Sequence, residues 1–194
     1  MEMQGTRRLA VSQQQAWDAL NDPQVLKACI PGCDRVEATG ENQYAIGMAV
    51  KVGPVAARFN GKITLLDVLP PNSYTLNFEG QGGAAGFGKG NAKVMLTPPA
   101  EGAGCVLNYT ATAQVGGKIA QVGQRLIDGV AKAMAEDFFK RFEGEMERRH
   151  PQAFQAEAAL PPPAPPVAKK PQFPMWGWAL VAAAVAAVVI LLVR

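Results

Sequence analysis

Residues 118–149 read Lys-Ile-Ala-Gln-Val-Gly-Gln-Arg-Leu-Ile-Asp-Gly-Val-Ala-Lys-Ala-Met-Ala-Glu-Asp-Phe-Phe-Lys-Arg-Phe-Glu-Gly-Glu-Met-Glu-Arg-Arg. Apolar side chains recur along this stretch at steps of four, with charged residues between them. The spacing predicts one long amphipathic helix whose apolar stripe packs on the rest of the domain. The stripe consists of Val122, Leu126, Val130, Met134, Phe138 and Phe142, widened by Ile119, Ile127 and Ala133.

The residues before this helix have a period of two, which is typical of strands. Turn-forming pairs such as Gly53-Pro54 and Pro70-Pro71 separate the periodic segments. Short connections between successive strands favour antiparallel pairing, and a first strand at 2–11 would join one edge. The sequence therefore predicts an α+β fold with a curved antiparallel seven-stranded sheet around a long C-terminal helix. The other predicted strands are 34–39, 43–52, 55–69, 73–79, 89–97 and 105–115.

Two short helices are expected between the first two strands. Ser12 and Gln15 have the spacing of a capping box, in which each side chain bonds the other residue's backbone N–H. Pro23 suits the first turn of the second helix, and Pro31-Gly32 ends it.

Composition limits the classes of function. Basic and acidic residues are nearly balanced up to His150, which argues against nucleic acid as a partner. The first residues lack the apolar core of a signal peptide, and the chain has 3 cysteines, an odd number. We therefore expect reduced thiols in the cytoplasm.

The C-terminal part differs in composition from the domain at 1–150. Residues 151–174 are rich in proline and would form an extended linker of at most about 70 Å. Residues 175–193 carry no charge, and as a helix they would measure about 28 Å, close to the thickness of a bilayer core. Trp176 and Trp178 suit the headgroup level at one end.

A single-pass transmembrane tail anchor at 175–194 is therefore expected. Lys169 and Lys170 precede it, and Arg194 alone follows it. The positive-inside rule then favours an N-terminal domain on the cytoplasmic side of the inner membrane.

Several segments resemble the family of carbon monoxide dehydrogenase G subunits, whose members have a START-like, or helix-grip, domain. The similarity covers about residues 1–148 and implies an apolar cavity between sheet and long helix. The segments that carry it are Asn21-Asp-Pro-Gln-Val-Leu-Lys-Ala-Cys-Ile-Pro-Gly-Cys33, Val52-Gly-Pro-Val55, Phe59-Asn-Gly-Lys62, Gly83-Ala-Ala-Gly-Phe-Gly-Lys-Gly90 and the stretch from Val115 to Gly129.

The resemblance implies an accessory role rather than an enzyme. It implies association with a molybdenum-containing carbon monoxide dehydrogenase or a related molybdenum hydroxylase, which the protein would recruit to the cytoplasmic membrane. A second implied role is to bind a respiratory quinone, menaquinone or ubiquinone, in the apolar cavity and pass it between membrane and enzyme.

A prenyl quinone has a flat polar head and an apolar tail, so aromatic and flexible apolar side chains suit it. Tyr109 and Gln114 are candidate hydrogen-bond donors for the head. For each candidate, ordinary core packing is the alternative. The residues expected to line the cavity are Trp17, Ile30, Phe59, Phe78, Phe87, Tyr109, Leu126, Val130 and Met134.

No catalytic or metal site is predicted. His150 is the only histidine and stands at a helix end, where it complements the helix dipole. Cys29 and Cys33 lack further ligands nearby, so buried structural cysteines are expected. The run Gly80–Gly90 lacks the Ser/Thr and the helix of a phosphate loop, and indicates a hairpin that presents Phe87. Two alternatives remain open: a membrane adaptor without ligand, and an enzyme of the polyketide-cyclase type.

Overall fold

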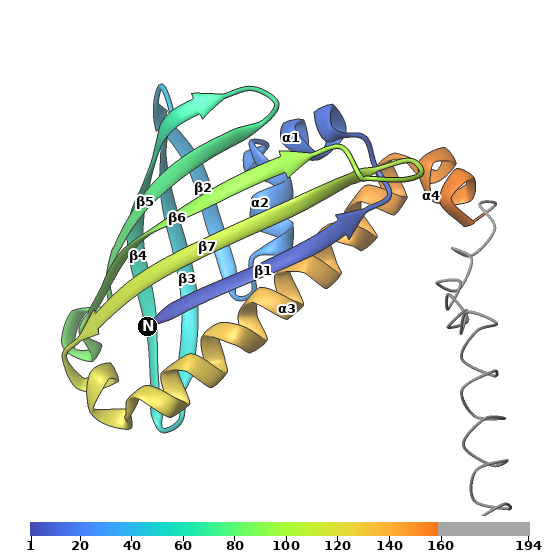
Figure 1. Ribbon diagram of the computed structural model, residues 1–194. Helices are drawn as coiled ribbons and strands as arrows, with labels where there is room; N and C mark the ends of the chain where they lie inside the picture. Colours follow the sequence, from blue (N-terminus) through green and yellow to red (C-terminus); the bar gives the residue numbers. More distant parts are fainter. Residues whose placement is uncertain (159–194) are drawn as a thin grey trace, which may run out of the picture. The chain divides into compact units, whose positions relative to one another are not determined.

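The computed structural model describes residues 1–158, in which seven strands and several helices form one sheet-and-helix unit (Figure 1). The elements in chain order are β1 (Glu2–Leu9), α1 (Gln13–Leu20), α2 (Pro23–Cys29), β2 (Cys33–Gly40), β3 (Gln43–Val52), β4 (Val55–Leu69), β5 (Ser73–Gln81), η1 (Gly83–Ala85), β6 (Phe87–Thr97), β7 (Cys105–Gly116), η2 (Lys118–Val122), α3 (Gln124–Arg149) and α4 (Pro151–Ala158).

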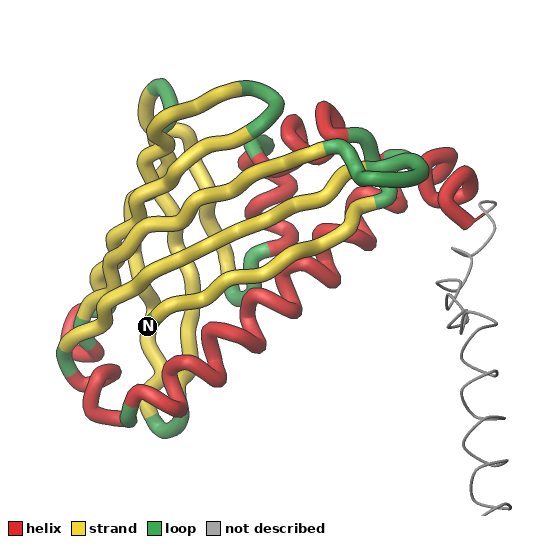
Figure 2. Tube along the Cα trace, in the orientation of Figure 1, coloured by secondary structure: helices red, strands yellow, loops and turns green. Residues whose placement is uncertain are grey.

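The sheet is antiparallel throughout, with the strand order β1-β7-β6-β5-β4-β3-β2. Strands β2 to β7 follow one another as a meander, and β1 returns to pair with β7, with Glu2 opposite Thr112 and Leu9 opposite Cys105. The sheet curves, and α3 lies across its open side next to β1 (Figures 1 and 2). The predicted α+β helix-grip arrangement of sheet and long helix is confirmed.

Local signals place the two short helices as expected. The Ser12 hydroxyl accepts a hydrogen bond from the Gln15 N–H, and the Gln15 side chain accepts one from the Ser12 N–H. Asp22 caps α2 by accepting from the Gln24 N–H, with Pro23 in the first turn. Helix α2 packs beside both β2 and α3, so it closes the side of the sheet opposite β1.

The long helix differs from its prediction at its start. Residues Lys118–Val122 form the 3-10 turn η2, and Gly123 has a φ of 96°, so α3 begins only at Gln124. A positive φ suits glycine and interrupts the helical backbone there. The chain can therefore change direction between β7 and α3.

The inward face of α3 also differs from a stripe at steps of four. Each such step turns the helix about 40° beyond a full turn, so a stripe at this spacing winds around it. Leu126 is accordingly 42% exposed, whereas the neighbouring Ile127 is buried. The other buried residues of α3 are Phe139, Phe142 and Met146.

Two apolar clusters hold the unit together. The main cluster joins the start of the chain and α1 to the C-terminal half of α3, around Leu9, Trp17, Leu107 and Phe142. The second is smaller, and its buried members are Val52, Ile119 and Ile127. Packing is therefore densest toward the C-terminal half of α3 and thinner around its N-terminal half.

Helix α4 was not expected, because Pro151 was predicted to begin an extended linker. A proline is tolerated in the first turn of a helix, and Ala153 and Phe154 pack against the main cluster. No helix within residues 1–158 has the length and apolar character to cross a bilayer. The rest of the predicted linker and the predicted tail anchor at 175–194 lie outside the described residues.

Candidate functional site

An apolar cavity of about 280 Å³ lies between the inner face of the sheet and the helices α2 and α3. Its lining is almost entirely aliphatic and aromatic, and Asn21 is the one amide among its lining residues in the described part of the chain. The Asn21 side chain donates to the Trp17 carbonyl oxygen at 2.8 Å. The lining residues are Leu20, Asn21, Leu26, Ile30, Val36, Tyr44, Ile46, Ile63, Leu65, Tyr74, Leu76, Ala92, Val94, Leu107, Tyr109, Ala135, Phe138 and Phe139.

Three tyrosines also line the cavity: Tyr44 on β3, Tyr74 on β5 and Tyr109 on β7. Within residues 1–158, none of their hydroxyls makes a hydrogen bond to another residue. Tyr74 is only 5% exposed, and its ring packs edge-on against Trp17 at a centroid distance of 5.5 Å. Because this hydroxyl has no hydrogen-bond partner among the described residues, it is a candidate hydrogen-bond donor to a ligand.

The Tyr74 hydroxyl stays protonated. Burial raises its pKa well above the usual range, and the neighbouring Tyr44 adds to the shift. At neutral pH the side chain is therefore a hydrogen-bond donor with an apolar body. Such a donor suits a ligand acceptor such as a carbonyl oxygen.

The Tyr109 hydroxyl points elsewhere. A Cβ built on Gly5 would lie 2.7 Å from it, so the phenol crosses over β1 at this glycine. The Tyr109 ring packs on Phe139 at a centroid distance of 5.4 Å. Tyr109 therefore contributes its ring to the cavity, whereas its hydroxyl lies toward the sheet edge.

Arg7 on β1 contacts α3. Its guanidinium forms an ion pair with Glu136 and lies 5.3 Å from the centre of the Phe139 ring. The Arg7 Nε is buried and has no hydrogen-bond partner among the described residues. This contact ties the edge strand to the helix beside the cavity.

Larger hollows lie on the outer face of the sheet, but their chemistry differs. One of about 650 Å³ is lined by polar side chains such as Lys62, Asn77, Glu79 and Lys89. It is open, and charged and amide side chains make up much of its wall, which makes it a poor site for an apolar ligand. The smaller cavity between sheet and α3 is the stronger candidate on physical grounds.

The comparisons with known proteins agree with this architecture. The family model for the carbon monoxide dehydrogenase G subunit (CoxG) matches residues 5–146, most of the chain. The chain belongs to the CoxG family. The family's description as part of a dehydrogenase implies association with carbon monoxide dehydrogenase.

Solved structures share the CoxG domain's fold. A conserved protein from Geobacillus kaustophilus is 35% identical, with a TM-score of 0.72 and a match over 77% of this chain and 97% of that one. A crystallised chain can thus consist almost entirely of this domain. Among curated proteins, none matches the sequence.

Two more distant structures show the fold alone. A protein from Thermus thermophilus is 15% identical, with a TM-score of 0.59 over 77% of this chain and 99% of that one. The Zhui aromatase/cyclase from a Streptomyces species is 16% identical, with a TM-score of 0.55 over 77% of this chain and 94% of that one.

Of the nine residues predicted to line the cavity of this CoxG domain, the structure brings Ile30 and Tyr109 to its wall. Trp17 is buried behind Tyr74 in the main cluster. Phe59 and Val130 pack with the second cluster instead. These two belong to the thinner apolar layer around the N-terminal half of α3.

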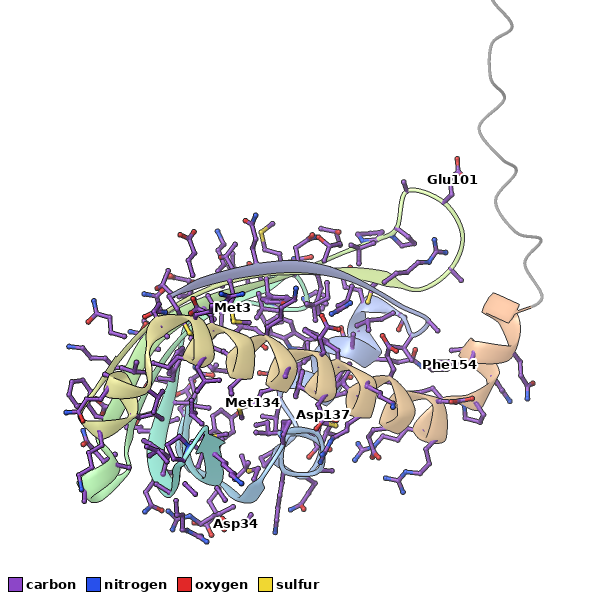
Figure 3. All side chains as sticks on the ribbon, turned by 90° about the horizontal axis from the view of Figure 1, so that it is seen from below. Met3, Asp34, Glu101, Met134, Asp137 and Phe154 are labelled. Atoms are coloured by element: carbon purple, nitrogen blue, oxygen red, sulfur yellow. The ribbon has the colours of Figure 1, made fainter. Side chains whose placement is uncertain are left out.

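Four other predicted residues also lie outside the cavity wall. Phe78 lies over Gly90 on a neighbouring strand, where a Cβ would be 2.7 Å from its ring. Phe87 is 39% exposed and covers Gly116, its partner in the β6–β7 pair. Leu126 is exposed beside Gly53, and Met134 projects from the middle of α3 (Figure 3).

The hydrogen-bond donors proposed for the ligand head were predicted only in part. Gln114, a predicted donor, lines the polar hollow on the outer face. Tyr44 and Tyr74 were missed, although alternation along β3 and β5 puts them on the same face as Ile46 and Leu76. That signal was present in the sequence and would have found both.

The cysteines lie where buried structural residues are expected. Cys29 and Cys105 are buried, and burial raises the pKa of each thiol to about 11. Cys33 is half-buried, and its thiol donates to the Arg35 carbonyl oxygen at 3.4 Å. Within residues 1–158 no group of three His, Cys, Asp or Glu side chains has the geometry of a metal site.

His150 caps the end of α3, as predicted from the sequence. Its Nδ1 lies 3.2 Å from the Gln15 side-chain amide, so it links α3 to α1. Neither His150 nor any carboxylate is among the described lining residues of the cavity. The acid–base groups that a cyclase-type enzyme needs in its cavity are therefore not among these residues.

Proposed function

We propose that this CoxG protein binds the ring of a respiratory quinone in the cavity between sheet and α3, and carries it between the membrane and carbon monoxide dehydrogenase. The observation that carries the proposal is Tyr74, a 5% exposed residue of the apolar cavity wall whose hydroxyl has no hydrogen-bond partner among residues 1–158. A quinone offers carbonyl oxygens as acceptors on an apolar ring. Ring and cavity therefore complement each other in polarity.

The cavity volume supports a ring rather than a whole prenyl quinone. An apolar cavity of about 150 Å³ admits benzene, and ligand pockets commonly span about 300–1,000 Å³. At about 280 Å³ the cavity has room for a substituted ring system and a short part of the tail. In this proposal the remaining prenyl units lie outside the cavity.

The cavity also bears on the alternative of an adaptor without ligand. A pure adaptor needs only a filled core and a contact surface, and a filled core is more stable than one with a void. A void bounded by 18 residues is thus better explained by a ligand.

The role at the membrane rests on the family and on the sequence beyond the described residues. The uncharged stretch 175–193 has the length of a membrane anchor. In this proposal the anchor keeps the domain at the cytoplasmic face of the inner membrane, where its effective concentration near bilayer and enzyme is high. Carbon monoxide dehydrogenase, when it binds this domain, is then recruited to the same membrane surface.

Trp17 offers a direct test, because it is the only tryptophan in residues 1–158. It contacts Tyr74, so a quinone in the cavity is expected to quench its fluorescence. Titration of residues 1–158 with a short-chain quinone is predicted to give saturable quenching.

A filled cavity supplies the matched control. Ala135 lines the cavity, whereas Ala133, on the same helix, is exposed. Ala135→Leu is expected to lower the quinone affinity, measured by quenching, at least tenfold, which is about 1.4 kcal/mol. Ala133→Leu is expected to leave the affinity unchanged. Equal quenching in both variants would show that the quinone binds somewhere else.

A further inference from the structure

The connections between successive strands lie at two opposite ends of the antiparallel sheet. Three of them meet at the end where α3 begins: residues 51–56, 81–87 and 116–126 (Figures 1 and 2). The other three, residues 39–43, 66–73 and 97–105, meet at the opposite end. We call these groups the basic end and the acidic end, for the charges described next.

Charge is divided between the two ends. The connections of the basic end contain Lys51, Lys118 and Arg125 and no carboxylate. Those of the acidic end contain Glu41, Asp67 and Glu101, and the Arg8 guanidinium reaches this end by donating to the Glu101 and Ala103 carbonyl oxygens. The three basic side chains of the basic end are exposed, and none forms an ion pair within the described residues. The basic end is therefore free to attract an anionic surface.

Apolar side chains project at the same end. Leu126 is 42% exposed and Phe87 39% exposed, although both are large. Leu126 lies against the β3–β4 turn, since a Cβ on Gly53 would be 2.9 Å from its Cδ2 atom. Exposed apolar groups surrounded by basic residues are typical of segments that lie in a membrane interface.

The three connections also form a preassembled surface. A Cβ on Gly86 would lie 1.9 Å from the Gly116 carbonyl oxygen, so the β5–β6 and β7–η2 connections touch backbone to backbone. Gly86 has a φ of 118°, which glycine adopts readily. The basic and apolar side chains thus stand on a fixed base rather than on separate loops.

We propose that the basic end docks the folded domain onto the surface of an anionic lipid bilayer. The charges complement anionic headgroups, and Leu126 and Phe87 are placed to enter the interface. These features favour a bilayer over a protein partner, because exposed apolar side chains flanked by basic residues are typical of segments that lie in a membrane interface. This inference does not depend on the cavity or on its ligand.

The sequence beyond residue 158 makes a bilayer the most accessible partner. If 175–193 anchors the chain, the domain is never far from a lipid surface, and a weak contact suffices. Each basic residue near an anionic surface strengthens binding by about fivefold, so three give roughly a hundredfold at low salt. Salt screens this attraction.

Vesicle flotation tests the proposal with residues 1–158. The Geobacillus kaustophilus chain, 97% of which matches 77% of this chain, crystallised as little more than this domain. The domain is expected to float with vesicles of equal parts phosphatidylglycerol and phosphatidylcholine, and not with phosphatidylcholine alone. Joint substitution of Lys51, Lys118 and Arg125 by Gln is expected to reduce binding to anionic vesicles roughly a hundredfold.

Matched variants separate this surface from general charge. Substitution of Lys27, Lys93 and Lys140 by Gln removes the same charge elsewhere and is expected to change binding less than threefold. Leu126→Gln is expected to weaken binding at high as well as low salt, and Leu69→Gln at the acidic end to have no effect. Thermal melts of all variants confirm that they are folded.

Three outcomes would overturn the proposal: equal losses in both triple variants, no flotation of the wild-type domain, or equal binding to neutral vesicles. Flotation that fails while the basic end binds the dehydrogenase would make it a protein contact instead, which also overturns it.

Discussion

The ring and the hydroxyl of Tyr74 have different roles in the account given above. Its ring packs on Trp17 in the main cluster, while its hydroxyl has no partner among residues 1–158. A protein under selection for stability alone gains nothing from this hydroxyl, because phenylalanine would pack equally well. The proposed function gives this hydroxyl a role, as a hydrogen-bond donor to the ligand.

The variant Tyr74→Phe separates the two roles. The free energy of unfolding is expected to stay the same or rise slightly, because the removed hydroxyl makes no hydrogen bond in the free domain. Quinone affinity, measured by quenching of Trp17, is expected to fall about fivefold, roughly 1 kcal/mol.

Tyr109→Phe is the control for this variant. Tyr109 lines the same cavity, but its hydroxyl lies over Gly5 at the sheet edge. Its removal is expected to leave the affinity within about twofold of the wild type. A larger loss with Tyr109→Phe than with Tyr74→Phe would place the head of the ligand at β1 instead.

At the scale of elements, the structure shows which parts of the fold the sequence predicts well. Strands β3 and β4 match their predicted limits, because alternation and the turn at Gly53-Pro54 are both local signals. Ser12, Gln15 and Pro23 likewise place α1 and α2 through contacts within a few residues. The start of α3 was wrong because Gly123 interrupts a pattern that periodicity alone continues.

The site was predicted less well than the fold, and the reason is also physical. Alternation along a strand predicts which residues lie on the inner face of the sheet. Ala92 and Val94 lie on the inner face of β6, so alternation places Phe87 on the outer face and excludes it from the cavity wall. Position along the helix does not follow from local sequence. Phe59 and Val130 face inward but pack in the second cluster, because α3 meets the sheet differently at its two ends.

Arg149 links two elements that are distant in sequence. It donates to Asp22, the cap of α2, at 2.9 Å and to Glu145 on α3 at 2.6 Å. Burial by itself raises the pKa of Asp22, but hydrogen bonds from the Gln24 amide and Arg149 outweigh it and lower the pKa. Hydrogen bonds from Arg148 and then Arg149 lower the pKa of Glu145.

This network makes stability depend on pH in a defined direction. Carboxyl groups with lowered pKa values stabilise the fold above their unfolded pKa of about 4, and the contribution is lost as pH falls through the folded pKa values. Arg149→Met is expected to cost about 1 kcal/mol at pH 7, because the groups are partly exposed, and much less near pH 2.

Urea unfolding at both pH values measures the difference. Arg148→Met is the control, because Arg148 contacts Glu145 alone and its side chain is 74% exposed. Its expected cost is about 0.3 kcal/mol at pH 7. An equal cost of Arg149→Met at both pH values would show that packing of its stem, and not its charge, supports the α2–α3 contact.

At the scale of the whole molecule, the proposals assign separate tasks to separate parts. In them the described domain supplies the cavity and the lipid-facing basic end, and the residues after 158 supply the permanent attachment. Removal of 159–194 keeps α4, whose Ala153 and Phe154 pack on the main cluster, and so leaves the domain intact.

Truncation after residue 158 is therefore expected to abolish stable recruitment of the dehydrogenase to membranes while quinone binding persists. Membrane sedimentation of the dehydrogenase from cells with full-length or truncated protein measures the first effect, and Trp17 quenching the second. Full recruitment by the truncated protein would show that the domain alone suffices as an anchor.

Extraction of quinone from a bilayer tests the central claim most directly. Residues 1–158 are mixed with vesicles that contain a respiratory quinone, separated from the lipid by density, and analysed by mass spectrometry. The proposal predicts quinone in the wild-type fraction at a ratio approaching one per domain, and little with Ala135→Leu. Equal traces of quinone with both proteins would contradict it.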